Sequence, residues 1–230
     1  SPHLYVTYRM ALSFLISGTG PRSGKTTVGV ALAFAFKVRA MRVGVMKPVQ
    51  TGCVERDGMP PADDAAAMLA AASSDLPPDL ACLYRYRSAL PPAAAAEADG
   101  APLPDWARIE QACRDVISHS DATLIEDTEG LAAPIDWQHS YADLARTFDL
   151  SLILVVANRA GFINAAALTL DYAARRGIEV CGFIMNALDR DASATVTRDA
   201  EFLSRATGAI CLGAVRFKEP LSLSIVERLL

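Results

Sequence analysis

A glycine-rich segment near the N-terminus has the composition of a phosphate-binding loop. Residues 16–27 read Ile-Ser-Gly-Thr-Gly-Pro-Arg-Ser-Gly-Lys-Thr-Thr, after a short apolar run and before a helical pattern. In that context backbone N–H groups of the loop and of the helix N-terminus face phosphate oxygens. The alternative is an ordinary glycine-rich turn. We expect a nucleotide site made by Gly20, Ser23, Gly24, Lys25, Thr26 and Thr27, with Lys25 on the β- and γ-phosphates.

Polar side chains also stand at the ends of later apolar runs. Lys47 and Thr51 follow one run, Glu126 ends another, and Asn186 follows a third. Ligands gather at the carboxyl ends of parallel strands, so these residues are candidates for the same site. Phosphoryl transfer needs positioned positive charge, which Lys25 and Lys47 can supply from two strand ends. Thr51 can hydrogen-bond a substrate or a phosphate. Alternatively, Lys47 is a solvated surface lysine, Glu126 is a charged residue at a strand end, and Asn186 is a turn residue.

Hard oxygen ligands suited to Mg²⁺ are present near the same strand ends. Thr26 offers a hydroxyl, and Glu126 offers a carboxylate. Asp63 and Asp64 are equally acidic neighbours at the start of a helical segment, and the residues themselves leave the choice between them open. An acid at a helix N-terminus can also be there only for the helix dipole. We expect a magnesium site with some retained waters.

Alternating apolar runs and helical patterns must position these residues. The order predicts an α/β fold with a doubly wound, mostly parallel sheet flanked by helices, of the P-loop NTPase type. In residues 77–104, rich in Pro and Ala, we expect loops, a short extended piece at 83–86 and a plain surface turn of helix at 93–96. Other expected strands are 11–17, 42–46, 122–126, 151–157, 179–185 and 209–212, and expected helices are 26–38, 62–72, 106–118, 141–148, 163–176 and 194–206.

Composition limits the class of protein. The 230 residues, 52% of them hydrophobic, predict one domain over 1–230, with 1–10 as a loose extension or a cloning remnant. With a net charge of −4, the chain lacks the excess of basic residues that nucleic-acid-binding proteins usually carry. The longest apolar run, near 150–157, is too short to span a membrane, and no signal peptide is evident. Five scattered cysteines favour free thiols, so we expect a cytoplasmic protein.

Several motifs in order resemble the dethiobiotin synthetase family. The phosphate-binding loop is followed by Met-Lys-Pro-Val-Gln-Thr-Gly at 46–52, which is very similar to the family's Lys-Pro-Val segment. These two motifs together are specific, whereas the remaining matches are weak singly. The resemblance covers roughly residues 13–213. The other matches are Asp64, Glu126, the segment Gly161-Phe162-Ile163-Asn164 with Leu168-Thr169, and Asn186.

The resemblance implies an activity and assigns roles. Dethiobiotin synthetases take 7,8-diaminopelargonate, CO₂ and ATP with Mg²⁺; an amine forms a carbamate, the carbamate attacks the γ-phosphate, and the second amine closes a cyclic urea. By this resemblance Lys47 and Thr51 bind the substrate, and Asp64 rather than Asp63 binds the metal. By the same resemblance, Asn186 forms hydrogen bonds with the adenine ring. Asn164 lies near a homodimer interface and faces the substrate carboxylate, although it can equally be a helix cap.

The chain departs from the family on the substrate side. Where the family has Glu-Gly-Ala-Gly-Gly, this chain has Glu-Asp-Thr-Glu-Gly at 126–130, so two glycines are replaced by acids. Pro21 and Arg22 also depart from the family's usual residues. We therefore expect Arg22 to pair with Asp127 or Glu129 over the substrate cleft; the alternative is that both acids point to solvent.

Four other functions compete with a synthetase. A related ligase for a different amine or carboxylate, or a non-catalytic nucleotide-binding paralogue, agrees with the altered loop. A partitioning ATPase is disfavoured, because those proteins usually carry a second lysine five residues before Lys25, and that position is Gly20 here. A cobyrinate-type amidotransferase is disfavoured because no glutaminase portion follows.

Overall fold

The computed structural model of the chain describes residues 12–53 and 63–230. The strands are β1 (Leu12–Gly18), β2 (Val43–Met46), β3 (Val49–Gln50), β4 (Tyr84–Arg85), β5 (Ala122–Glu126), β6 (Ser151–Ala157), β7 (Val180–Asn186) and β8 (Cys211–Val215). The helices are α1 (Lys25–Lys37), α2 (Asp63–Ala72), α3 (Pro78–Ala81), α4 (Pro92–Ala98), α5 (Trp106–Ser118), α6 (Tyr141–Thr147), α7 (Phe162–Arg175), α8 (Arg190–Thr207) and the 3₁₀ helix η1 (Leu223–Arg228).

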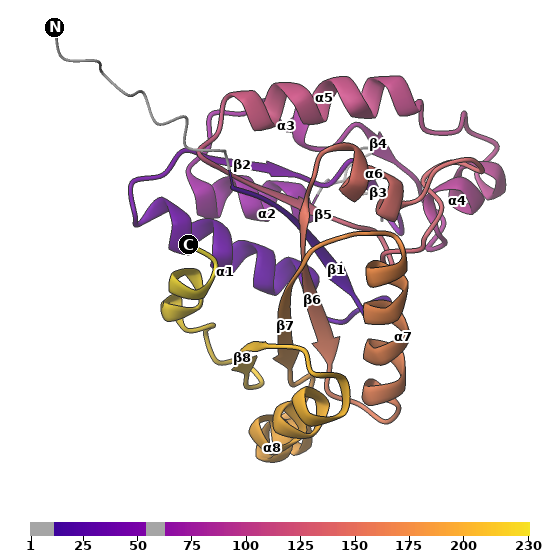
Figure 1. Cartoon of the computed structure of the whole chain (residues 1–230). Helices are drawn as coiled ribbons and strands as arrows, with labels where there is room; N and C mark the ends of the chain where they lie inside the picture. The colour runs from indigo at the N-terminus through magenta and orange to yellow at the C-terminus, as the bar shows by residue number, and fades with distance from the viewer. Residues whose placement is uncertain (1–11, 54–62) are drawn as a thin grey trace, which may run out of the picture.

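Six of the strands form one parallel sheet. Their order is β2-β5-β1-β6-β7-β8, and every neighbouring pair is parallel. The short strands β3 and β4 form a separate parallel pair. Figure 1 shows helices on both faces of the large sheet. The predicted doubly wound α/β fold is confirmed, and the central β1 ends where a crevice is expected in such a sheet.

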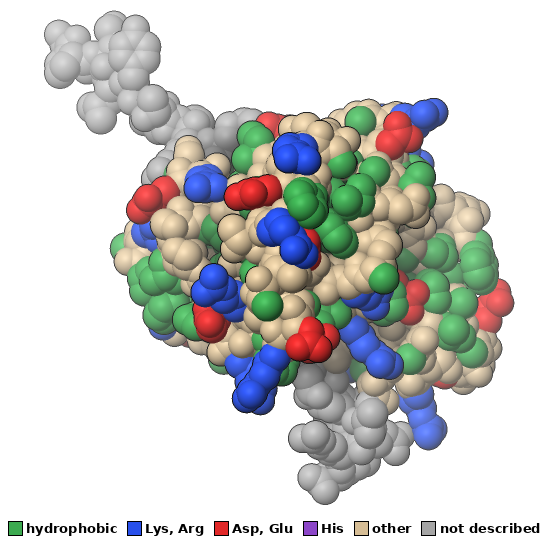
Figure 2. Space-filling model, turned by 90° about the horizontal axis from the view of Figure 1, so that it is seen from below, with side chains coloured by type: hydrophobic (Ala, Val, Ile, Leu, Met, Phe, Trp, Pro, Cys, Tyr) green, Lys and Arg blue, Asp and Glu red, His purple; other side chains and the backbone are tan. Residues whose placement is uncertain are grey.

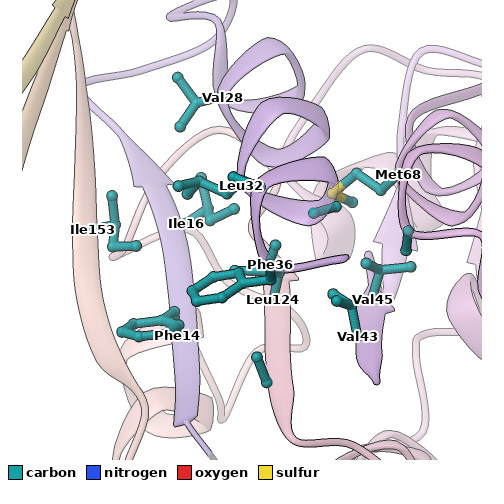
Figure 3. Packing of buried hydrophobic residues seen from close by; sticks show 14 of the residues in the cluster. Phe14, Ile16, Val28, Leu32, Phe36, Val43, Val45, Met68, Leu124 and Ile153 are labelled. Atoms are coloured by element: carbon teal, nitrogen blue, oxygen red, sulfur yellow. The ribbon is translucent and has the colours of Figure 1, made fainter. Parts of the chain in front are cut away.

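Alternate residues of β1 face opposite sides of the sheet, and each side has its own helices. Phe14 and Ile16 belong to the hydrophobic cluster that includes α1, α2 and η1, and Figure 3 shows both beside Phe36 of α1. The rings of Phe14 and Phe36 stack with centroids 5.9 Å apart. Leu15 belongs to the cluster on the other side, which includes α5 and α6. The residues at the end of β1 are therefore fixed from both faces.

The helix pair on the first face is closely packed at Gly29 of α1. A Cβ atom added at Gly29 would lie 2.7 Å from the sulfur of Met68 in α2, so the Met68 side chain would have to shift to admit it. Gly29 is thus a contact site between the two helices. On the surface, Figure 2 shows Lys and Arg side chains scattered among acidic and hydrophobic ones on the face that it presents.

The segment 77–104 differs from its prediction. The expected extended piece is present as β4, and α3 precedes it where a loop was expected. The helical turn expected at 93–96 is present as part of α4, but its expected surface position is wrong, because Ala93, Ala95 and Ala96 are fully buried. Two of them pack in the cluster that contains Tyr86, since a methyl side chain allows α4 to approach closely. Helix α8 also begins earlier than expected, and η1 was not predicted.

Candidate functional site

The phosphate-binding loop joins the end of β1 to the start of α1. Gly24 precedes Lys25, the first residue of α1, with a left-handed φ of 93° that favours glycine. A Cβ atom at Gly24 would also collide with the side chain of Asn186. The Asn186 amide donates to the Ser23 carbonyl at 2.9 Å. The end of β7 therefore supports the loop, across 163 residues of sequence.

The side chain of Lys25 is buried at this loop. Its Nζ atom donates to the Gly20 carbonyl at 3.4 Å and lies 3.5 Å from Oδ1 of Asp127. Asp127 is fully buried, and neither of its carboxylate oxygens makes a hydrogen bond of good geometry to the described residues. Burial raises the pKa of Asp127, and the charge of Lys25 opposes that rise. A buried counter-ion thus holds the Lys25 ammonium against the loop.

A network of four side chains from separate elements is centred on Glu126, the last residue of β5. Thr26 donates its hydroxyl to Oε1 of Glu126 at 2.9 Å, and the Lys47 ammonium donates to the same oxygen at 2.8 Å. Lys47 also pairs with Oδ2 of Asp64 in α2. The network forms because β2 and β5 are parallel neighbours, so Lys47 and Glu126 leave the sheet at the same edge.

Burial and charge act in opposite directions on this network. Burial by itself would lower the pKa of Lys47, but the charges of Glu126 and Asp64 outweigh it, and the pKa of Lys47 is raised. Burial raises the pKa of Glu126, and the charge of Lys47 opposes that rise. Lys47 is therefore a fixed positive charge between two carboxyl groups.

The oxygen atoms of this network fit a divalent cation. The second oxygen of Glu126, Oε2, is buried and has no hydrogen-bond partner among the described residues. With the Asp64 carboxylate and the Thr26 hydroxyl it makes a small set of hard oxygen ligands. No cluster of three or more His, Cys, Asp or Glu side chains suited to a metal occurs within 12–53 and 63–230. Phosphate oxygens and waters would have to complete the coordination, as Mg²⁺ commonly requires. The side chain of Asp63 lies outside the described part.

Most of the predicted residues line one cavity of about 400 Å³. The cavity brings together the two lysines, Lys25 and Lys47, which come from different strand ends. A larger cavity of about 640 Å³ between α8, β8 and η1 contains none of the predicted residues, so the chemistry points to the smaller one. Predicted residues that line the smaller cavity are Ser23, Gly24, Lys25, Thr26, Thr27, Lys47, Thr51, Asp64 and Glu126.

Three predicted residues are not among those lining this cavity. Gly20 lines a neighbouring cavity of about 490 Å³ together with Thr169 and Tyr172 of α7. Asn186 lies under the loop, and its adenine contact stays a prediction. Asn164 is exposed in the first turn of α7. It does not cap this helix, because the N-cap position is Gly161.

The expected ion pair between Arg22 and the acids after Glu126 is wrong for Asp127. Asp127 points into the protein and meets Lys25, so neither pairing with Arg22 nor exposure to solvent describes it. Arg22 makes no ion pair within 4 Å in the described part of the chain. Glu129 lines both cavities and has a left-handed φ of 75°, in the place of a family glycine.

Asp127 is the functional residue that sequence reasoning missed. It follows Glu126 directly, and successive residues at a strand end point in opposite directions. That alternation could have indicated that Glu126 faces the network with Thr26 and Lys47 while Asp127 faces Lys25. Asp127 was instead grouped with Glu129 as a charge of the substrate-side loop.

The described residues include no helix that is both long and apolar enough to cross a membrane. The AAA_26 family model, described as an AAA domain, matches residues 13–223. Among solved structures, the chain is similar to a ParA family ATPase from Chlorobium tepidum TLS, with 13% identity, a TM-score of 0.51, and coverage of 95% of this chain and 89% of that chain.

Two further solved structures are similar. Chloroplast FtsY from Physcomitrella patens has 19% identity and a TM-score of 0.50, over 95% of this chain and 65% of that chain. A MinC:MinD cell division protein complex from Aquifex aeolicus has 12% identity and a TM-score of 0.51, over 95% of this chain and 85% of that chain. At these identities the likenesses describe the fold alone. The family match reaches further: this chain belongs to the AAA_26 family of P-loop NTPase domains, which includes dethiobiotin synthetase.

Proposed function

We propose that the protein is an ATP-dependent cyclo-ligase that converts 7,8-diaminopelargonate and CO₂ into a cyclic urea. One observation carries the proposal: Lys25 and Lys47, from two strand ends, line the same cavity as Thr26, Asp64 and Glu126. A simple hydrolase or switch needs the first lysine and the metal ligands. A second lysine aimed at the same space suits a second anionic reactant, such as a carbamate.

The residues divide the work by position. Lys25 holds the transferring phosphates, with Asp127 behind it as counter-ion. Lys47 meets the carbamate oxygen that attacks the γ-phosphate, and Thr51, on the cavity wall, hydrogen-bonds the substrate. Thr26, Asp64 and Glu126 would hold Mg²⁺, which when bound offsets charge on the phosphate oxygens. That attack breaks the bond between the γ-phosphorus and the β-phosphate oxygen, so ADP leaves and a carbamoyl-phosphate mixed anhydride forms. The second amine then attacks the carbonyl carbon, and phosphate leaves with the former carbamate oxygen as the ring closes.

A nucleotide switch or a non-catalytic paralogue is the second candidate. Glu129, an acid that lines the cavity in place of a family glycine, favours it, since its side chain takes up space on the substrate side. The similarity to the ParA and MinD structures supports the fold and carries no information about activity. A related ligase acting on a different amine or carboxylate would use the same phosphate and metal residues.

Phosphate release separates these candidates. Purified protein with MgATP and bicarbonate should release phosphate only when 7,8-diaminopelargonate is added, with dethiobiotin found by mass spectrometry in equal amount. Release that is independent of the diamine would favour the switch, and bound ATP without release would favour the paralogue.

The Lys25→Ala variant should abolish turnover. Because it leaves Asp127 buried without a partner, the double variant with Asp127→Asn is the better-folded test. Lys37→Ala at the other end of α1 is the control and should keep full activity. Near wild-type turnover in a folded Lys25 variant would refute the site.

A further inference from the structure

The turn between β6 and α7 carries a cation next to the phosphate-binding loop. Thr19 of the loop donates its N–H to the Val155 carbonyl at 3.1 Å, and its hydroxyl accepts from the Ala157 N–H at 3.3 Å. Asn158 is buried and donates to the Ala192 carbonyl at 3.0 Å. The residue that follows, Arg159, is therefore anchored from two sides although its own side chain is exposed.

The Arg159 guanidinium lies over Gly20 of the loop. One of its terminal nitrogens, Nη2, is 3.4 Å from the place that a Cβ atom on Gly20 would take. The Lys25 ammonium is 3.4 Å from the carbonyl oxygen of the same Gly20. Two cations, one from α1 and one from the β6–α7 turn, thus flank one peptide unit of the phosphate-binding loop.

The two cations differ in how far they are neutralised. Lys25 has the buried carboxylate of Asp127 at 3.5 Å. Arg159 has no carboxylate within 4 Å in the part of the chain that the structure describes. Arg159 therefore lies beside the phosphate-binding loop, on an anchored turn, with its charge available for an anion. Its planar fork can give two parallel hydrogen bonds to phosphate oxygens.

We infer that Arg159 is a phosphate-binding residue that contacts the phosphate chain of the bound nucleotide from the β6–α7 turn. The inference rests on the proposed nucleotide site and adds a residue to it.

Arg22 is the other arginine near the loop, and its placement is different. It lies within the loop, has a left-handed φ of 55° and is exposed. Arg159 lies instead on the β6–α7 turn, which the hydrogen bonds of Thr19 and Asn158 fix beside the loop.

Nucleotide binding measured by calorimetry in the presence of Mg²⁺ tests the inference. Arg159→Ala should weaken ATP binding by about 10- to 100-fold, which is the usual loss for hydrogen bonds to a charged group. Binding of adenosine should stay within about twofold of wild type, because adenosine has no phosphate. Arg159→Lys should recover part of the ATP affinity, since it restores charge but not the fork.

The matched control is Arg175→Ala. Arg175 is an exposed arginine at the far end of α7 and pairs with Asp171 at 2.8 Å. It should leave the affinities for ATP and adenosine unchanged, and thermal unfolding of all three variants should match wild type. The salt dependence of ATP binding should become shallower in Arg159→Ala only.

Three results would overturn the inference. ATP affinity within twofold of wild type in Arg159→Ala would do so, and so would an equal loss for ATP and adenosine, which would indicate a structural role. A raised KM for the diamine with unchanged ATP affinity would assign the cation to the second substrate. Lys25→Ala distinguishes a failure of this inference from a failure of the proposed function. If Lys25→Ala weakens ATP binding and Arg159→Ala does not, only the inference about Arg159 is wrong. If the wild type binds no ATP, the proposed function falls with it.

Discussion

The ammonium nitrogen of Lys47 lies 2.8 Å from Oε1 of Glu126, the oxygen that also accepts the Thr26 hydroxyl. The same ammonium pairs with Asp64. The positive charge of one residue therefore stands among the three groups proposed to bind a divalent cation. A metal ion and this ammonium cannot both take the same position, because like charges at such distances repel strongly.

We predict that Lys47→Met tightens binding of Mn²⁺ to the nucleotide-free protein. Removing the competing charge should raise the affinity by at least about tenfold. Electron paramagnetic resonance titration of free Mn²⁺ measures this without any turnover. Lys37→Met, on the exposed end of α1, is the control. Equal Mn²⁺ affinity in Lys47→Met and wild type would contradict the prediction.

Glu129 and Asp127 should respond in opposite ways to replacement by glycine. Glu129 has a φ of 75°, which costs an ordinary residue about 1 kcal/mol, so Glu129→Gly should raise the free energy of unfolding by up to that amount. Asp127→Gly should lower it, since the buried Lys25 loses its counter-ion at 3.5 Å. Urea unfolding of both variants checks this. A lower free energy of unfolding in Glu129→Gly would contradict backbone strain at Glu129.

The stability contribution of Asp143 should depend on pH. Asp143 accepts from the N–H and hydroxyl of Ser140 at 2.8 and 2.7 Å, and it pairs with Arg176. Burial acts to raise the pKa of Asp143, but the Ser140 hydrogen bonds and Arg176 outweigh it and lower the pKa. A lowered pKa means that the stabilisation is complete above the usual aspartate range and is lost as the pH falls through the folded-state value.

Asp143→Asn should therefore cost about 1–2 kcal/mol at pH 7 and progressively less below about pH 4. Chemical unfolding at several pH values between 7 and 3 measures the difference from wild type. Asp171→Asn, in an exposed pair on α7, should show little cost at any pH. A difference for Asp143→Asn that does not change with pH would rule out the carboxylate as its source.

Association should depend on the exposed apolar residues of α7. Leu168 is 63% exposed and Ile163 is 36% exposed, and Leu168 also lines the cavity beside the loop. If the proposed homodimer forms through this helix, Leu168→Asp should give a monomer by light scattering, because burying a charge at an interface is costly. Phe202→Asp on α8 replaces another exposed hydrophobic residue and should leave the dimer intact. A wild-type monomer at assay concentrations would end this prediction.

Some features of the protein could be predicted from the sequence because they depend on neighbours along the chain. The segment 16–27 contains its own strand end, glycines and helix start, so its shape is local. The α/β order follows from apolar runs and helical patterns and is confirmed. The family match agrees with the resemblance at its broader level, while dethiobiotin synthesis itself stays a prediction.

Other features were decided only by tertiary structure. Sequence patterns place Lys47 and Glu126 at strand ends, but only the order β2-β5-β1 makes their side chains touch. The direction of Asp127 was misjudged because the burial of a side chain depends on what packs around it. The approach of Arg159 to Gly20 spans 139 residues of sequence, and no pattern along the chain encodes it. Contacts of this kind arise because parallel strands bring distant segments to one edge of a sheet, where the packing of each side chain sets its partner.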